Sequence, residues 1–204
     1  MKQTIDLRTV KIFDGGTEYF GADQRWFENS WHSLSGCGPT TAAMITMHMA
    51  AAFPKTCRPL YPFPLPATKQ DFTAHMNRIR PFVKPGPMGL KSTARFASGT
   101  AAYAKKMGVK LVPQVVSRGL SMVNAFGYLQ KAVEHNYMPA LLILKNPSKE
   151  ISDFHWHWMA VTGVDAETKS VYVSTYGGEF ELPFELVWHQ QKPYEAGIVY
   201  FYPE

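Results

Sequence analysis

Cysteine is scarce in this chain, which has only Cys37 and Cys57 among its 204 residues. Two cysteines are too few for a disulfide framework and exclude the small, disulfide-stapled class of secreted domain. One bridge between them remains an alternative at this point. Charged residues are also few, at 18%, and 46% of the residues are hydrophobic. A chain of this length and composition is expected to bury a sizeable core in a single domain.

Long apolar runs and blocks of like charge are missing as well. No apolar run reaches about 18 residues, which excludes a membrane-spanning helix. The net charge is +5, but the basic residues are scattered, so we expect no nucleic-acid partner. The first residues contain no apolar signal-peptide core. We therefore expect a cytoplasmic location, with secretion after removal of a leader as the alternative, and we expect no cofactor.

Helical and strand-like patterns divide the chain unequally. The patterns predict a fold of the α+β class, in which helices precede an antiparallel sheet. A single domain over 1–204 is expected, with a helical lobe over about 30–136 and a β lobe over about 138–204 that also takes the N-terminal arm. Helices are predicted over 40–52, 69–80, 92–107, 121–136 and 184–188. An edge strand or extended arm is predicted over 5–13, and strands over 109–116, 137–145, 156–164, 170–176, 179–183 and 197–202.

Cys37 lies between Gly36 and Gly38, directly before a segment that is apolar on every helical face. Such a segment is typical of a buried helix. A helix N-terminus offers unpaired N–H groups and a partial positive charge, which are expected to lower the pKa of a thiol placed there. The two glycines would let a substrate carbonyl approach, and the Cys37 N–H would serve as an oxyanion donor. The alternative is a small buried side chain beside a turn.

A histidine is needed as the base for a cysteine nucleophile, and the chain has seven. His155 and His157 begin a predicted strand, where alternation places them on one face. A pair spaced in this way is also a zinc-ligand pattern. Since no further ligands follow at a suitable spacing, we expect no metal. Packing beside Trp156 and Trp158 is the other alternative for these two histidines.

The stretch "SGCGPTTAAM", followed far downstream by "HWMAVTGVD" and "VYVS", resembles the papain-like cysteine peptidases. Within them it is most similar to the bacteriocin-processing type and its stand-alone bacterial relatives. The lead-in "GADQRWFENSW" is similar to the segment before the cysteine in the stand-alone members. The resemblance implies a papain-like fold and a peptide or amide substrate. It implies that Cys37 is the nucleophile and that His157, rather than His155, is the base.

The remaining site residues follow from the same resemblance and from its departures. The family's oxyanion glutamine position holds Trp31 here, so the nearest upstream glutamine, Gln24, is the candidate. The family's third catalytic member, an Asn or Asp, falls on Ser174, with Thr175 as second choice. Gly36, Gly38, Trp31 and Trp156 are the candidate substrate-binding residues. Because a hydroxyl stabilises an imidazolium less than a carboxylate does, a catalytically weak or inactive binding module is the alternative function.

Overall fold

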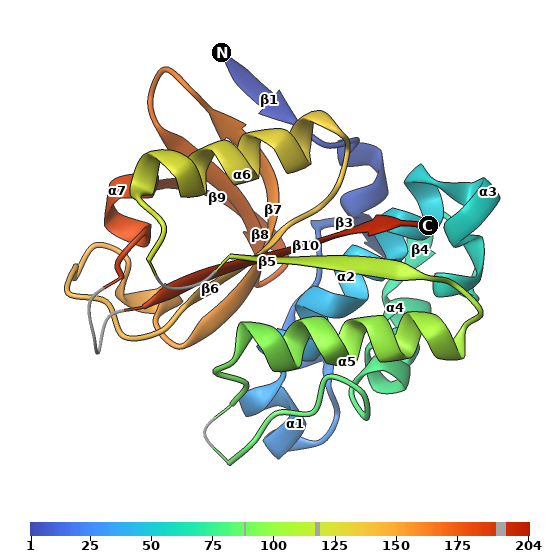
Figure 1. Ribbon diagram of the computed structural model, residues 1–204. Coiled ribbons are helices and arrows are strands. Elements are labelled where there is room, and N and C mark those ends of the chain that lie inside the picture. Colours follow the sequence, from blue (N-terminus) through green and yellow to red (C-terminus); the bar gives the residue numbers. More distant parts are fainter. Residues whose placement is uncertain (88, 117–118, 191–194) are drawn as a thin grey trace.

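The computed structural model describes residues 1–87, 89–116, 119–190 and 195–204. In it a buried helix, α2 (Cys37–Ala52), packs against an antiparallel sheet, and further helices lie on both sides of that sheet (Figure 1). The predicted α+β class is confirmed. A central buried helix packed against an antiparallel sheet is the arrangement that the resemblance to papain-like peptidases implies.

The main sheet has the strand order β5-β10-β6-β7-β8-β9, and β1 pairs with the far end of β7. Every pairing within this sheet is antiparallel. One strand, β5, comes from the range predicted to form the helical lobe, so the division expected near residues 136–138 does not coincide with the edge of the sheet. The strands are β1 (Lys2–Thr4), β5 (Leu111–Val116), β6 (Ala140–Ile143), β7 (His157–Asp165), β8 (Ser170–Thr175), β9 (Gly178–Pro183) and β10 (Ala196–Pro203).

The N-terminal arm differs from its prediction. A 3-10 helix, η1 (Leu7–Val10), interrupts the edge strand or extended arm predicted over 5–13, and only the end of that range, from Lys11, forms a strand, so a continuous strand there is wrong. The cause is local, because the Asp6 side chain accepts the Arg8 N–H at 3.1 Å and so starts a turn. After η1 the chain forms a second, three-stranded sheet in the order β3-β2-β4. Its strands are β2 (Lys11–Asp14), β3 (Thr17–Phe20) and β4 (Ala67–Thr68).

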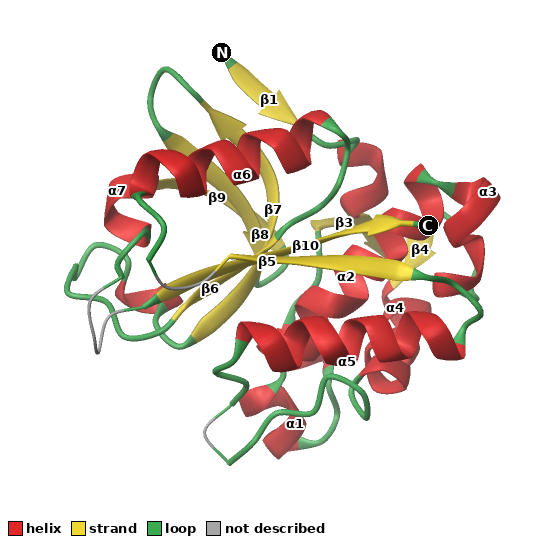
Figure 2. Cartoon of the chain, in the orientation of Figure 1, coloured by secondary structure: helices red, strands yellow, loops and turns green. Residues whose placement is uncertain are grey.

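Helix α2 is apolar on every side because it is covered on every side. It contacts β7, α4 (Lys69–Ile79) and α5 (Thr93–Lys106), and its residues from Cys37 to Ala50 are all buried. Helix α6 lies across strand β10 from α5, as Figures 1 and 2 show. The other helices are α1 (Ser30–Ser35), α3 (Pro54–Cys57), α6 (Met122–Glu134) and α7 (Phe184–Val187), with 3-10 turns η2 (Gln24–Trp26), η3 (Arg58–Leu60) and η4 (Ser152–Phe154). None of the helices in the described residues is long and apolar enough to cross a bilayer.

Two histidines lie in the core and are separate from the candidate site. His48 on α2 is hydrogen-bonded through Nδ1 to Thr9 Oγ1 at 2.6 Å and through Nε2 to the Asn136 carbonyl at 2.7 Å. His75 on α4 is hydrogen-bonded through Nε2 to Thr46 Oγ1 at 2.9 Å. Burial lowers the pKa of His48 to about 4 and that of His75 to about 3, so both rings are neutral at neutral pH.

Candidate active site

Cys37 is the first residue of α2, and only 7% of its surface is exposed. Helix α1 ends at Ser35, so the single residue Gly36 connects the two helices. A Cβ on Gly36 would lie 2.4 Å from the His32 carbonyl oxygen, and one on Gly38 would lie 3.1 Å from a Leu90 methyl. Close packing therefore accounts for Gly36, whereas a side chain at Gly38 would need only a small shift of Leu90. Their contact with a substrate stays a prediction.

The electrostatics of the thiol differ from the sequence-based expectation. Burial raises the pKa of Cys37, while the backbone N–H groups of Trp158, Gly38 and Cys37 itself lower it by a smaller amount. The helix N-terminus does favour the thiolate, but desolvation of a nearly enclosed sulfur outweighs it. The resting side chain is a thiol. Cys57 is also free and fully buried, so the alternative of a bridge to Cys37 is not realised.

His157 is the first residue of β7 and is buried. Its Nε2 lies 2.7 Å from Thr175 Oγ1, and its ring stacks on Tyr176 with centroids 4.7 Å apart. Burial lowers the pKa of His157 to about 4, and the nearby Asp23 carboxylate opposes this change. The imidazole is therefore neutral at neutral pH and able to accept a proton. Since Thr175 occupies Nε2, the nitrogen left for a thiol is Nδ1.

The hydroxyl that contacts His157 belongs to Thr175, the second choice from the sequence, and not to Ser174, the first choice. Strand pairing gives the physical reason. Ala160 lies opposite Ser174, so Ser174 shares the face of even-numbered residues of β7, and Thr175 shares the face of His157. The Ser174 hydroxyl instead donates to the Phe20 carbonyl at 2.8 Å. Assigning Ser174 as the partner of His157 was wrong.

The prediction that His155 and His157 share one face of a strand is also wrong. Trp156 adopts a left-handed conformation with φ of 56°, and β7 begins only after it. The alternation therefore does not extend back to His155, whose Nε2 is buried without a hydrogen-bond partner. Within the described ranges, no group of three or more His, Cys, Asp or Glu side chains is placed to hold a metal ion. The expectation of no metal stays a prediction.

Cys37 and His157 belong to one site but are not hydrogen-bonded to each other in the described part of the chain. The Trp158 N–H, one residue beyond His157, lies close enough to the sulfur to affect its pKa. Thr175, which holds His157, also lines a small cavity together with Cys37. Contacts between a nucleophile and its base are often long without substrate and tighten when it binds. The structure therefore brings Cys37 near the start of the strand that carries His157, and proton transfer between the two side chains stays a prediction.

That small cavity also brings Gln24 to Cys37. Its volume is about 10 Å³, which is about the space that one water needs. The Gln24 Nε2 donates to the Ser33 carbonyl at 2.7 Å, while its Oε1 and the Thr40 Oγ1 are buried without partners. Gln24 thus lines the same cavity as Cys37, 13 positions before it in the sequence (37 − 24), and its role as an oxyanion donor stays a prediction, because the unpartnered atom is the acceptor Oε1. Thr40 is a polar neighbour of the sulfur that the sequence did not single out.

A larger groove opens on another side of Cys37. Its volume is about 320 Å³, and both predicted aromatic residues, Trp31 and Trp156, line it with 49% of their surface exposed. The described residues that line it are Trp31, Leu34, Ser35, Cys37, Pro87, Gly89, Lys91 and Trp156. The structure therefore brings Cys37, Trp31 and Trp156 together.

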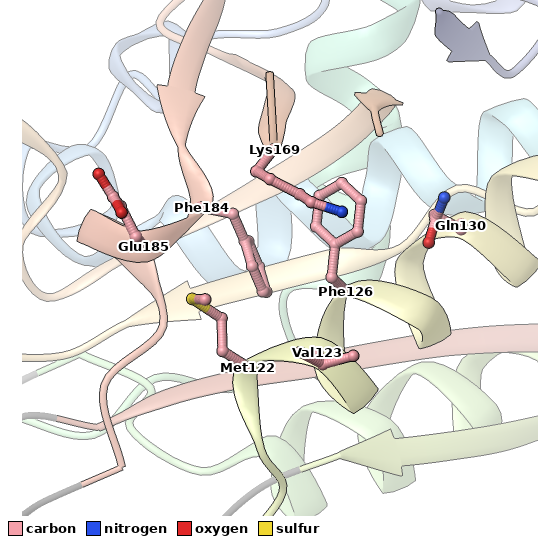
Figure 3. Close-up of a pocket in the computed structure, with 7 residues that line it drawn as sticks. All are labelled: Met122, Val123, Phe126, Gln130, Lys169, Phe184 and Glu185. Carbon is pink, nitrogen blue, oxygen red and sulfur yellow. The ribbon is translucent and has the colours of Figure 1, made fainter. Parts of the chain in front are cut away.

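A separate apolar cavity of about 150 Å³ lies between α6, α7 and the turn before β8 (Figure 3). Phe126 and Phe184, whose ring centroids are 5.2 Å apart, both line it, and Lys169 extends over the Phe126 ring. The described residues that line it include no cysteine, serine, threonine or histidine. Its described lining therefore contains none of the residue types that the sequence singles out as nucleophile, base or hydroxyl partner.

Two residues near His157 were missed from the sequence. Asp23 is buried, and its carboxylate accepts hydrogen bonds from the Arg25 backbone N–H and side-chain Nε, each at 2.8 Å. Tyr176 covers the His157 ring and donates its hydroxyl to the Asp153 carbonyl at 3.0 Å. The only sequence signal for Asp23 is its place in the Asp-Gln-Arg-Trp lead-in, and Tyr176 has none, because both contacts depend on tertiary packing.

Comparison with known proteins adds little to this geometry. No family model and no curated protein matches the chain. Among solved structures, the chain is similar to the Pseudomonas avirulence protein AvrPphB, at 13% sequence identity, 81% coverage of this chain, 90% coverage of that chain and a TM-score of 0.35. Similarity at this level identifies neither a family nor an activity.

Proposed function

We propose that the protein is a papain-like thiol hydrolase, a cysteine peptidase or a related amidohydrolase. The reaction forms a thioester between Cys37 and the acyl group of a peptide or amide. The proposal depends on how Cys37 and His157 are arranged. A cysteine at the N-terminus of a buried helix lies beside a strand whose first residue, His157, is a neutral imidazole held through Nε2 by Thr175.

The first half of the reaction transfers the acyl group. For His157 Nδ1 to act as a base, Nε2 carries the hydrogen and donates it to Thr175. The Cys37 sulfur attacks the substrate carbonyl as its proton moves to Nδ1. The carbonyl oxygen takes up negative charge and accepts hydrogen bonds from the Cys37 N–H and from the second Nε2–H of Gln24, whose first N–H donates to the Ser33 carbonyl. The carbon–nitrogen bond then breaks, and Nδ1–H protonates the departing amine.

The second half releases the product. Water attacks the thioester carbon while His157 Nδ1 removes its proton, and the sulfur leaves and is reprotonated. A thiolate–imidazolium pair is not needed at rest, which agrees with a raised pKa for Cys37 and a pKa of about 4 for His157. As His157 becomes positive, the Asp23 charge favours the cation. Asp23 thereby supplies part of the stabilisation that the hydroxyl of Thr175 cannot.

A catalytically weak or inactive binding module is the second candidate function. It is favoured by the enclosed Cys37 thiol, by its raised pKa, and by the missing hydrogen bond between Cys37 and His157 among the described residues. In that case the groove beside Cys37 would hold a peptide without cleaving it.

The test is digestion of a synthetic peptide library, with products identified by mass spectrometry. We expect cleavage by the wild type and by Cys57→Ala, the matched control for the second buried cysteine, and none by Cys37→Ala. Equal cleavage by Cys37→Ala would overturn the proposal. Peptides retained by the wild type without cleavage would favour the binding module.

A further inference from the structure

The groove of about 320 Å³ beside Cys37 is lined by large apolar side chains that are exposed to solvent. Trp31 and Trp156 are each 49% exposed, Leu34 is 76% exposed, and all three line this groove. Single exposed apolar residues are ordinary on a surface, but several gathered in one concave patch indicate a ligand. The volume, about 320 Å³, is near the lower end of the range of about 300 to 1,000 Å³ for ligand pockets. It suits a side chain or a short segment rather than a folded partner.

The groove is held in place from two parts of the chain. Trp31 lies on α1, which Asn29 caps by accepting the His32 N–H at 3.1 Å. Trp156 lies on the opposite segment, in a left-handed conformation that is unfavourable for a bulky side chain. Its N–H donates to the Leu144 carbonyl at 3.1 Å. Trp156 is thus fixed in an exposed position, where burial of its ring in the core does not offset the cost of the conformation.

The described part of the groove carries a positive charge. Lys91 is the one charged side chain among the described residues that line it, and its Nζ lies 4.7 Å above the Trp156 ring. A ligand group entering beside Trp156 therefore meets apolar surface and a cation. An ammonium group there would be repelled, whereas a carboxylate would be attracted.

We propose that this groove selects the substrate of Cys37. It binds a bulky apolar group, preferably aromatic, next to the bond that is cleaved, and it discriminates against a positive charge at that position. This inference rests on the proposed function, because the group that the groove binds belongs to the substrate, on the carbonyl side or the amine side of the bond that Cys37 cleaves. It predicts poor use of substrates that present only glycine beside the cleaved bond.

The test is alkylation of Cys37 by iodoacetamides that differ only in their N-substituent. Alkylation forms one carbon–sulfur bond with loss of iodide and needs no acyl transfer, so it tests the groove even in a protein that cleaves no peptide. The substituents are methyl, 2-phenylethyl, 2-carboxyethyl and 2-ammonioethyl. Each rate is measured by intact mass, assigned to Cys37 by digestion, and divided by the rate of the same reagent with N-acetylcysteine.

We expect the 2-phenylethyl reagent to react about tenfold faster than the methyl reagent after this correction. The 2-carboxyethyl reagent should react faster than the 2-ammonioethyl one, and Lys91→Glu should reverse that order. Trp31→Ala and Trp156→Ala should each reduce the aromatic preference severalfold. Val123→Ala, an exposed apolar residue on α6, is the matched control and should leave the preference unchanged.

Equal corrected rates for the methyl and 2-phenylethyl reagents would overturn the inference. So would an aromatic preference that both tryptophan variants retain, or a Cys37 that reacts with none of the four reagents. If the protein cleaves no library peptide but still shows the aromatic preference, the proposed hydrolysis fails and the proposed role of the groove in binding an aromatic group is supported.

Discussion

Replacing Thr175 with valine removes the hydroxyl that lies 2.7 Å from His157 Nε2 and keeps the branched shape of the side chain. Two effects follow in the buried site. The ring loses the contact that fixes its orientation, and in the tautomer that the proposed reaction needs, the buried Nε2–H loses its acceptor. The tautomer with hydrogen on Nδ1 becomes competitive, and in that tautomer Nδ1 cannot accept the thiol proton.

The magnitude follows from these two effects. A neutral hydrogen bond contributes about 1 kcal/mol, and an unsatisfied buried donor costs about 1 to 3 kcal/mol. If about 1 to 2 kcal/mol of this appears in the transition state, Thr175→Val should acylate about five- to thirtyfold more slowly. The Thr175→Ser variant keeps the hydroxyl and should retain most of the rate.

The assay is single-turnover release of p-nitrophenolate from p-nitrophenyl acetate at neutral pH. Ser174→Ala is the matched control, because its hydroxyl bonds the Phe20 carbonyl and not His157. That variant should lose about 1 kcal/mol of stability with little change in rate per folded molecule. An unchanged rate in Thr175→Val, or an equal loss in Ser174→Ala, would refute the assignment of Thr175.

Three further predictions follow from burial and close contacts. The pKa of His75 is about 3 when folded and near 6.5 when unfolded, so the unfolded chain binds more protons and stability falls as pH drops below 6.5. From pH 7 to 5 this loss of stability is about 2 kcal/mol. The His75→Gln variant should therefore lose about 2 kcal/mol less than the wild type over that range in urea unfolding. An unchanged pH dependence would contradict a buried, neutral His75. Gly36→Ala should lower the free energy of unfolding by about 1 to 3 kcal/mol, since its Cβ meets a backbone oxygen at 2.4 Å, and an unchanged urea midpoint would count against this packing. Unsubstituted iodoacetamide should label Cys37 before Cys57, which is fully buried and has a pKa of about 11. Because burial raises the pKa of Cys37 too, its labelling rate should keep rising with pH into the alkaline range. Faster labelling of Cys57 in a peptide map would be the contrary result.

Local patterns allowed much of the fold to be predicted. The all-apolar segment after Cys37 predicts a buried helix, and α2 is one. Ser92 and Ser121 precede the helical patterns that they cap, and the strands β7 to β10 coincide with the strand-like apolar and aromatic segments that predict them. These signals are short in range, so neighbouring residues suffice to carry them.

The details of the site depend on contacts distant in sequence. The choice between Ser174 and Thr175 is decided by the register with Ala160, and the β7–β8 register shifts between Val161 and Gly163. A gap counted along the chain cannot contain that information. Asp23 lies more than a hundred residues from His157, so no local pattern relates the two. The direction of the Cys37 pKa also needed the structure, because the helix N-terminus is visible in the sequence and the burial is not.

The most direct test of the account is the mass of the acyl-enzyme. The wild type is mixed with p-nitrophenyl acetate, quenched in acid within the burst, and measured as the intact protein and after digestion. The account predicts one acetyl group on Cys37, removed by hydroxylamine, present in Cys57→Ala, absent in Cys37→Ala and formed far more slowly in His157→Gln. An acetyl group on another residue, or acylation of Cys37 at the wild-type rate in His157→Gln, would contradict the assignment of this pair as nucleophile and base.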